Sequence, residues 1–151
     1  MDMQDAAERA DEMLDRVLAE IDPSVRWVHG PTTTGGCTVT RRRTVMTVVS
    51  PQRRGSLLGV VDRFWRKSGY RVTAINSHVD APAIFVRTRD GFQVSLTVAD
   101  KGQVHFDVDS PCVRHSEVAD STSQPTAFLD PDAELIPRPN IHSDFWSATG
   151  S

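Results

Sequence analysis

The chain has 151 residues, of which 38% are hydrophobic and 25% charged, and this length suits one domain with a core rather than two. No apolar run reaches the roughly 18 residues of a membrane-spanning helix, and the first residues, MDMQDAAERADEM, lack the basic and apolar regions of a signal peptide. An exported form would therefore need a targeting segment that this sequence does not contain.

The net charge of −3 conceals three blocks of unlike charge. Residues 1–22 carry 2 basic against 8 acidic side chains, residues 23–101 carry 13 against 4, and residues 102–151 carry 2 against 8. The middle is therefore +9 and each flank −6. This arrangement indicates either ion pairing between middle and flanks or an anionic partner for the middle. We favour ion pairing, because no aromatic residues are interleaved with the arginines as single-stranded nucleic acid would require for stacking.

The first part of the chain reads as a helix, a short strand and a long strand. Between residues 3 and 21, apolar residues recur at spacings of three and four with charged residues between them, which is typical of an amphipathic helix. The stretch VRWVHG (25–30) suits a short strand and PTTTGG (31–36) a loop, and the next stretch, GGCTVTRRRTVMTVVS, contains the first long strand, residues 37–49.

The middle of the chain changes from a helical period to a strand period. Ser50 as N-cap, Pro51 at the first helical position and Gly69 as the stop predict a second helix with one apolar stripe. Apolar and polar residues then alternate through four strands separated by turn residues, Asp90-Gly91 among them. The four predicted strands cover residues 70–77, 83–88, 92–99 and 103–109.

These elements predict an α+β fold, a single antiparallel sheet of about five strands with two helices packed on one face, in the order α-β-α-β-β-β-β. Residues 1–115 form this domain, and the proline-rich residues 116–151 fit neither period and are predicted to be an extended tail. Its apolar part, residues 136–146, is expected to anchor the tail on the domain or to dock on another protein. The anchoring side chains are Ile141, Phe145 and Trp146.

The two cysteines are predicted to form a disulfide. Cys37 opens the first long strand and Cys112 follows the last one, and antiparallel pairing of strand 37–49 with strand 103–109 would bring the two sulfurs together. Closing a loop of about 75 residues contributes about 4 to 5 kcal/mol in the chain-entropy account. Such a bond indicates an extracytoplasmic protein, whereas two separate buried thiols in a cytosolic protein are the alternative.

Three consecutive arginines, Arg41 to Arg43, lie in the middle of the first long strand. In a regular strand Arg41 and Arg43 would enter the core, which is costly without partners. A bulge in the triplet would instead place the guanidinium groups on the polar side or at an edge, and we favour this interpretation. A second interpretation is an anion- or partner-binding patch. Its members would be Arg41, Arg42, Arg43, Arg53 and Arg54.

No sequence motif identifies a reaction: GxSxG, P-loop, HExxH and dinucleotide fingerprints are all absent. His105, Asp107 and Asp109 project from one face of a strand, where they could bind a metal or act as acid and base. An ordinary solvated sheet face is the favoured interpretation. No cofactor and no metal site are predicted.

Four stretches carry a family resemblance: GGCTVTRRRTVMTVVS, GVVDRFWRKSGY, RDGFQVSL and RPNIHSDFWS. Together they resemble small, uncharacterised secreted proteins or lipoproteins of actinobacteria, from about residue 10 to Trp146. The resemblance implies export and, through a lipobox cysteine that this sequence lacks, anchoring to the outer side of the cytoplasmic membrane. It supplies no catalytic residues.

The expected function is that of a non-enzymatic, extracytoplasmic cell-envelope binding or accessory module. Its partner would be another protein or an envelope component, with peripheral membrane association through a lipid anchor absent from this sequence, and nucleic acid is not the expected partner. Besides the arginine patch, the candidate surface is the polar sheet face of Gln93, Ser95, Thr97, Gln103, His105 and Asp107. Two alternatives stay open: an envelope hydrolase or metal-dependent enzyme using His105 and Asp107, and anion or nucleic-acid binding through the basic middle segment.

Overall fold

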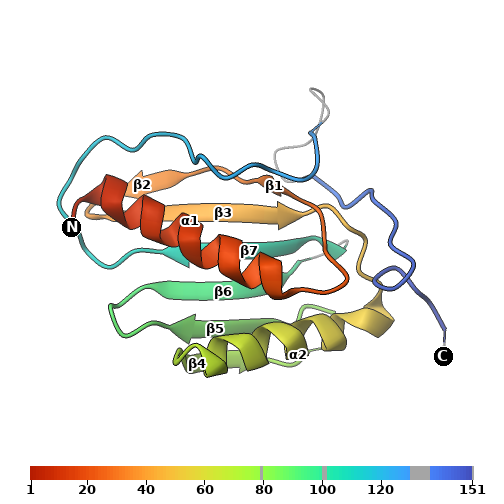
Figure 1. Cartoon of the computed structure of the whole chain (residues 1–151). Helices are drawn as coiled ribbons and strands as arrows, with labels where there is room; N and C mark the ends of the chain where they lie inside the picture. The colour runs from red at the N-terminus through yellow and green to blue at the C-terminus, as the bar shows by residue number, and fades with distance from the viewer. Residues whose placement is uncertain (79, 100–101, 130–136, 151) are drawn as a thin grey trace.

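A computed structural model describes residues 1–78, 80–99, 102–129 and 137–150. It confirms the α+β fold, with one open antiparallel sheet and two helices over the same face (Figure 1). The helices are α1 (Met3–Glu20) and α2 (Pro51–Lys67). The strands are β1 (Trp27–His29), β2 (Thr33–Gly35), β3 (Thr38–Val45), β4 (Arg71–Asn76), β5 (Ala83–Arg87), β6 (Gln93–Val98) and β7 (Val104–Asp109).

The described sheet has seven strands rather than about five, in the order β1-β3-β7-β6-β5-β4, with β2 paired to β3. The short strand expected at 25–30 is present as β1. The strand that was not expected is β2, because part of the segment predicted to be a loop forms a hairpin with the start of β3. Gly36, with φ of +59°, makes the turn between them. The threonines at 33 and 34 suit the extended conformation, and the sequence interpretation gave too much weight to the flanking proline and glycines.

The pairing of β3 with β7 is as expected and brings the cysteines together. The two strands run antiparallel from Thr40 opposite Asp109 to Val45 opposite Val104. The Cα atoms of Cys37 and Cys112 lie 4.8 Å apart and the two sulfurs are bonded. This confirms the predicted disulfide, which ties the start of β3 to the segment beyond β7.

Both helices bury their apolar stripes on one face of the sheet. The first helix, α1, starts with a capping box in which Asp2 and Asp5 each accept a hydrogen bond from the other's backbone N–H; it packs on β3 and β7, while α2 packs on β4 and β5. Trp65 of α2 meets Phe106 of β7 edge to face, with 6.3 Å between ring centroids. The opposite face of the sheet has no helix over it (Figure 1).

The segment after the disulfide runs back across the domain along the β1 and β2 side of the sheet (Figure 1). Backbone N–H groups of Thr126 and Ala127 donate to the Trp27 carbonyl, so this segment extends the β1 edge. Nearer the end of the chain, Trp146 is 1% exposed, and its indole N–H donates to the Pro23 carbonyl at 2.6 Å. Ile136, the first residue of the predicted anchor, lies outside the described residues.

Ile141 and Phe145, the other two predicted anchors, take different positions. The backbone of Ile141 forms a bridge with Thr47, and its side chain packs in a small cluster with Val28 and Met46. The Phe145 ring is 37% exposed and lies edge to face against Trp146. Close by, Ser50 occupies the N-cap position of α2 as predicted, but its hydroxyl donates to the Ala148 carbonyl at 2.5 Å and makes no side-chain cap.

Candidate functional site

The arginine triplet is regular, and the predicted bulge is wrong. Register between β3 and β7 is unbroken across Arg41, Arg42 and Arg43, so the first and third arginines point under α1, where they are 4% and 0% exposed. Regularity is possible because α1 brings carboxylates to this place. Asp11 lies 3.4 Å from both arginines and Asp15 lies 2.5 Å from Arg43. Buried cations of this kind persist only with such partners.

Further contacts hold the two buried guanidinium groups. Arg41 donates to the Thr32 hydroxyl and to the Ala119 carbonyl, both at 2.8 Å. The Arg43 guanidinium lies over the Trp27 ring, 4.1 Å from its centroid, where a cation is attracted by the π-electron face. Part of the positive charge of the middle segment is thereby neutralised by the acidic first helix.

The five arginines of the predicted patch do not form one surface. Arg42 lies on the other face of the sheet from its two neighbours, 3.6 Å from Asp107. Arg53 and Arg54 are in the first turn of α2, where Arg53 stacks 4.3 Å from the centroid of the Phe145 ring and donates to the Phe145 carbonyl. The sheet therefore separates Arg42 from Arg53 and Arg54.

The predicted polar residues do share the helix-free face of the sheet, which we call the open face. Cross-strand pairing aligns Arg42, Asp107, Ser95 and Phe85 in one row. The neighbouring row consists of Thr44, His105, Thr97 and Ala83, and Gln93 lies opposite Asp109. Gln103 immediately precedes β7 and is partly exposed. The Phe85 ring is 39% exposed on this face, next to the polar residue Ser95 in its row.

Asp107 and His105 are half-buried on the open face, and burial shifts both pKa values. Desolvation raises the pKa of Asp107, although the Arg42 guanidinium partly opposes this and Asp109 adds to it. Desolvation lowers the pKa of His105, which favours the neutral imidazole. The Thr44 hydroxyl lies 3.4 Å from Nδ1 of His105.

Two shallow hollows lie on the open face with Asp107 bordering both. One, of about 250 Å³, is lined by Arg42, His105 and Thr97 among others. The second, of about 240 Å³, is lined by Phe85, Ser95 and Asp109 among others. The described residues include no group of three or more His, Cys, Asp or Glu side chains arranged to hold a metal ion. Among the same residues, neither helix has the length and apolar character needed to cross a membrane.

A second basic cluster, which sequence reasoning did not single out, lies where β4 starts and β5 ends. Arg71 of β4 is directly opposite Arg87 of β5, and Arg89 follows two residues later. With Gly69 and Thr88 they line a hollow of about 360 Å³, which we call the arginine hollow. Arg87 and Arg89 at i and i+2, after a strand that starts with Arg71, were the signal in the sequence, but the hairpin register was needed to align them.

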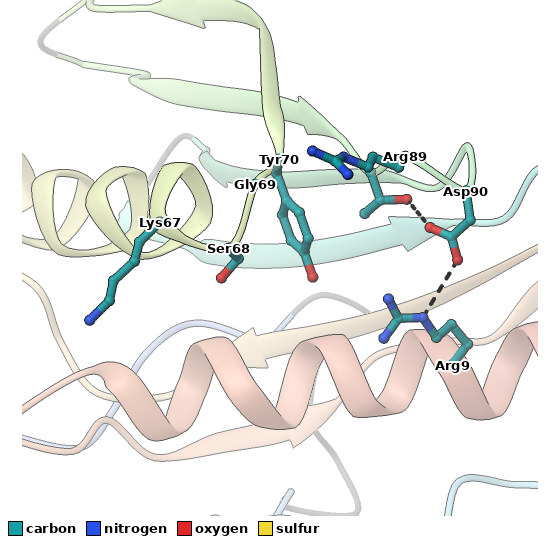
Figure 2. A pocket seen from close by; sticks show the side chains of 8 residues that line it. Arg9, Lys67, Ser68, Gly69, Tyr70, Arg89 and Asp90 are labelled. Atoms are coloured by element: carbon teal, nitrogen blue, oxygen red, sulfur yellow. Dashed lines mark hydrogen bonds and ion pairs between the residues drawn. The ribbon is translucent and has the colours of Figure 1, made fainter.

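An adjacent hollow of about 400 Å³ shares Gly69, Thr88 and Arg89 with the arginine hollow and opens toward α1 (Figure 2). Its one acidic residue, Asp90, is held by Arg9 at 3.6 Å and by the Thr88 hydroxyl at 2.5 Å. Burial raises the pKa of the Tyr70 phenol, which lies in this hollow. The phenol therefore stays protonated at neutral pH and can donate a hydrogen bond.

Comparison with known proteins gives no family for the chain. Neither a scan against protein-family models nor a search of curated proteins finds a match. Among solved structures, the chain is similar to a DUF4853 family protein from Actinomyces odontolyticus, with a TM-score of 0.40 and 14% identity over 91% of this chain and 81% of that one. A similarity at this level assigns neither a family nor an activity.

Proposed function

We propose that this protein is a non-enzymatic, extracytoplasmic binding module and that the open face is where it meets a partner protein. The observation that carries the proposal is the Phe85 ring, which is 39% exposed on the helix-free face of the sheet. Protein interfaces commonly combine an apolar centre with a polar rim. Here the rim is supplied by Ser95, Asp107 and Gln93.

Charge in the hollow beside Phe85 supports a partner with a cationic group. Asp107 and Asp109 border the same hollow as Phe85, and only one of them, Asp107, has an arginine beside it. Asp109 instead accepts a hydrogen bond from the Thr40 hydroxyl at 2.6 Å. A partner segment with a lysine or arginine next to an apolar side chain would complement this part of the face.

The compartment is supported by the disulfide, since such bonds persist mainly in oxidising environments. We propose export, with retention by a lipid anchor or release as a secreted protein. Cell fractionation followed by non-reducing intact-mass analysis tests this: recovery from the cytosol with both cysteines reduced would contradict it.

The test of the binding surface is capture of partners from a cell-envelope extract by immobilised protein. Ser95→Arg places a long cationic side chain beside Phe85, and we expect it to abolish recovery of the wild-type partner. Gln52→Arg is a matched control, because it adds the same charge on the exposed first turn of α2 and should leave recovery unchanged. If Ser95→Arg recovers the partner as well as Gln52→Arg does, the open face is not the binding surface.

A further inference from the structure

The arginine hollow concentrates positive charge without an opposing acid. Arg71 and Arg87 are directly cross-strand, and like charges in that position repel. None of the three arginines, counting Arg89, makes an ion pair or a side-chain hydrogen bond to another described residue, and no carboxylate is among the residues that line the hollow. In contrast, Arg41, Arg42 and Arg43 each have an acidic partner.

The acid that lies closest along the chain, Asp90, is occupied elsewhere. Its carboxylate is held by Arg9 from α1 and by the Thr88 hydroxyl, on the side of the adjacent hollow. Figure 2 shows this pair turned toward α1, while Arg89 points back toward Gly69 and Tyr70. Arg89 lines both hollows and has no carboxylate partner among the described residues.

The chemistry of the cluster indicates which anion it suits. Guanidinium groups present paired N–H donors in a plane that match two oxygens of a carboxylate or phosphate. One arginine satisfies a carboxylate, whereas a phosphate group offers three or more acceptor oxygens and up to two negative charges. Three arginines that line one space of about 360 Å³ thus match a phosphate group better than a carboxylate.

We propose that Arg71, Arg87 and Arg89 form a binding site for a phosphate group carried by a soluble phosphate compound or by a lipid head group. The remainder of such a ligand lies over the adjacent hollow, where Lys67 adds a further cation and the Tyr70 phenol a neutral donor. Arg87 is the cross-strand partner of Gln93 on the open face, so this site adjoins the partner-binding surface proposed above. It is built from other residues and does not depend on that proposal.

The experiment is titration of the intact, disulfide-bonded protein with pyrophosphate, monitored by calorimetry at constant ionic strength. We expect saturable binding, weakened about tenfold or more by Arg71→Gln and by Arg87→Gln, since each removes a hydrogen bond to a charged group. Arg63→Gln on the exposed side of α2 is the matched control and should bind as the wild type does. Unchanged circular dichroism and a melting temperature no lower than that of the wild type verify that the variants are folded.

Two further probes distinguish the source of the phosphate. Sedimentation with phosphatidylglycerol vesicles, but not phosphatidylcholine vesicles, that depends on Arg71 and Arg87 identifies a lipid head group, and pyrophosphate binding without sedimentation identifies a soluble compound. The proposal is overturned by the absence of saturable binding to either probe, or by equal weakening in Arg63→Gln. It is also overturned if only a single-stranded oligonucleotide binds, with an affinity that falls steeply with salt.

Discussion

Two clusters of arginine in this protein have opposite surroundings. Arg41 and Arg43 are buried under α1, with Asp11 and Asp15 against them. The arginine hollow at the other side of the sheet is open to solvent and has no carboxylate among its lining residues. A buried guanidinium with an acidic partner therefore contributes to the stability of the fold. A guanidinium without an acidic partner is available to a ligand. Arginine content alone does not separate the two cases.

The comparison also explains the charge blocks of the chain. The acidic first block supplies Asp11 and Asp15 to the buried arginines, and the acidic last block supplies Asp107 to Arg42. This is the ion pairing between middle and flanks that we favoured from the sequence. The pairing is incomplete, however, because the arginines at the β4 and β5 end receive no such acid among the described residues.

The largest effect is expected from Asp11→Ala. It removes the carboxylate that two buried guanidinium groups share, and breaking a buried pair in this way costs about 3 to 5 kcal/mol. Guanidinium chloride unfolding monitored by circular dichroism gives the free energy of unfolding. Glu12→Ala, which breaks the exposed pairs with Arg9 and Arg16, is the control and should cost at most about 1 kcal/mol. An equal loss of unfolding free energy in the two variants would contradict a special cost of leaving the buried arginines unpaired.

A smaller change is expected when the whole buried group is made apolar. Asp11→Leu combined with Arg41→Met and Arg43→Met removes the charges together, so no buried charge is left alone. Such replacements are often neutral or stabilising, and we expect a free energy of unfolding within about 2 kcal/mol of the wild type. A loss as large as that of Asp11→Ala would mean that the ion pairs themselves, rather than the avoidance of an unpaired charge, stabilise the core.

In the arginine hollow, removal of a charge should increase the free energy of unfolding rather than lower it. Arg87→Gln relieves repulsion with Arg71, and we expect it to raise the free energy of unfolding by about 0.2 to 1 kcal/mol at low salt. Because the Debye length is about 3 Å at 1 M salt, the gain should vanish there. The measurement is urea unfolding at two salt concentrations, and destabilisation at low salt would show that Arg87 has a structural partner.

Arg42, the middle arginine of the triplet, is partly exposed and ion-paired, and its removal should affect a pKa more than stability. Burial already raises the pKa of Asp107, and the Arg42 guanidinium partly opposes that rise. We therefore expect Arg42→Gln to raise the pKa of Asp107 further, measured by NMR titration of the carboxyl carbon. A carboxyl with a raised pKa binds its proton more tightly in the folded state, so its contribution favours folding as the pH falls through that pKa. An unchanged pKa would contradict direct coupling across the 3.6 Å ion pair.

Local patterns in the sequence were sufficient for most of the architecture. Apolar spacing predicted α1 and α2 almost to their ends, and the alternation of polar and apolar residues predicted β4 to β7. The position of the cysteines at the beginning of one strand and beyond the end of another predicted both the disulfide and the strand pairing. The helices and strands depend on residues that are neighbours in the chain. The disulfide depends on which two strands pair, and the positions of the cysteines indicated that pairing.

The interpretation failed where a residue depends on partners distant in the sequence. Arg41 and Arg43 were assigned to a bulge because nothing adjacent to them in the chain could neutralise them, yet their partners are 28 or more positions away in α1. The same holds for the open face, whose residues were predicted individually but whose hollows around Asp107 exist only after three strands align.

By itself, the sequence determined the order of elements, the apolar faces and the disulfide. The reason is that the spacing of apolar residues, the turn residues and the cysteine positions can be read from short stretches of the chain. Only the tertiary structure decided which cations are neutralised and which stay free. Asp11 and Asp15 meet the buried arginines when α1 packs on the sheet, and Arg71 faces Arg87 when β4 pairs with β5. Electrostatic energy depends on distances in space, and those distances are set by packing.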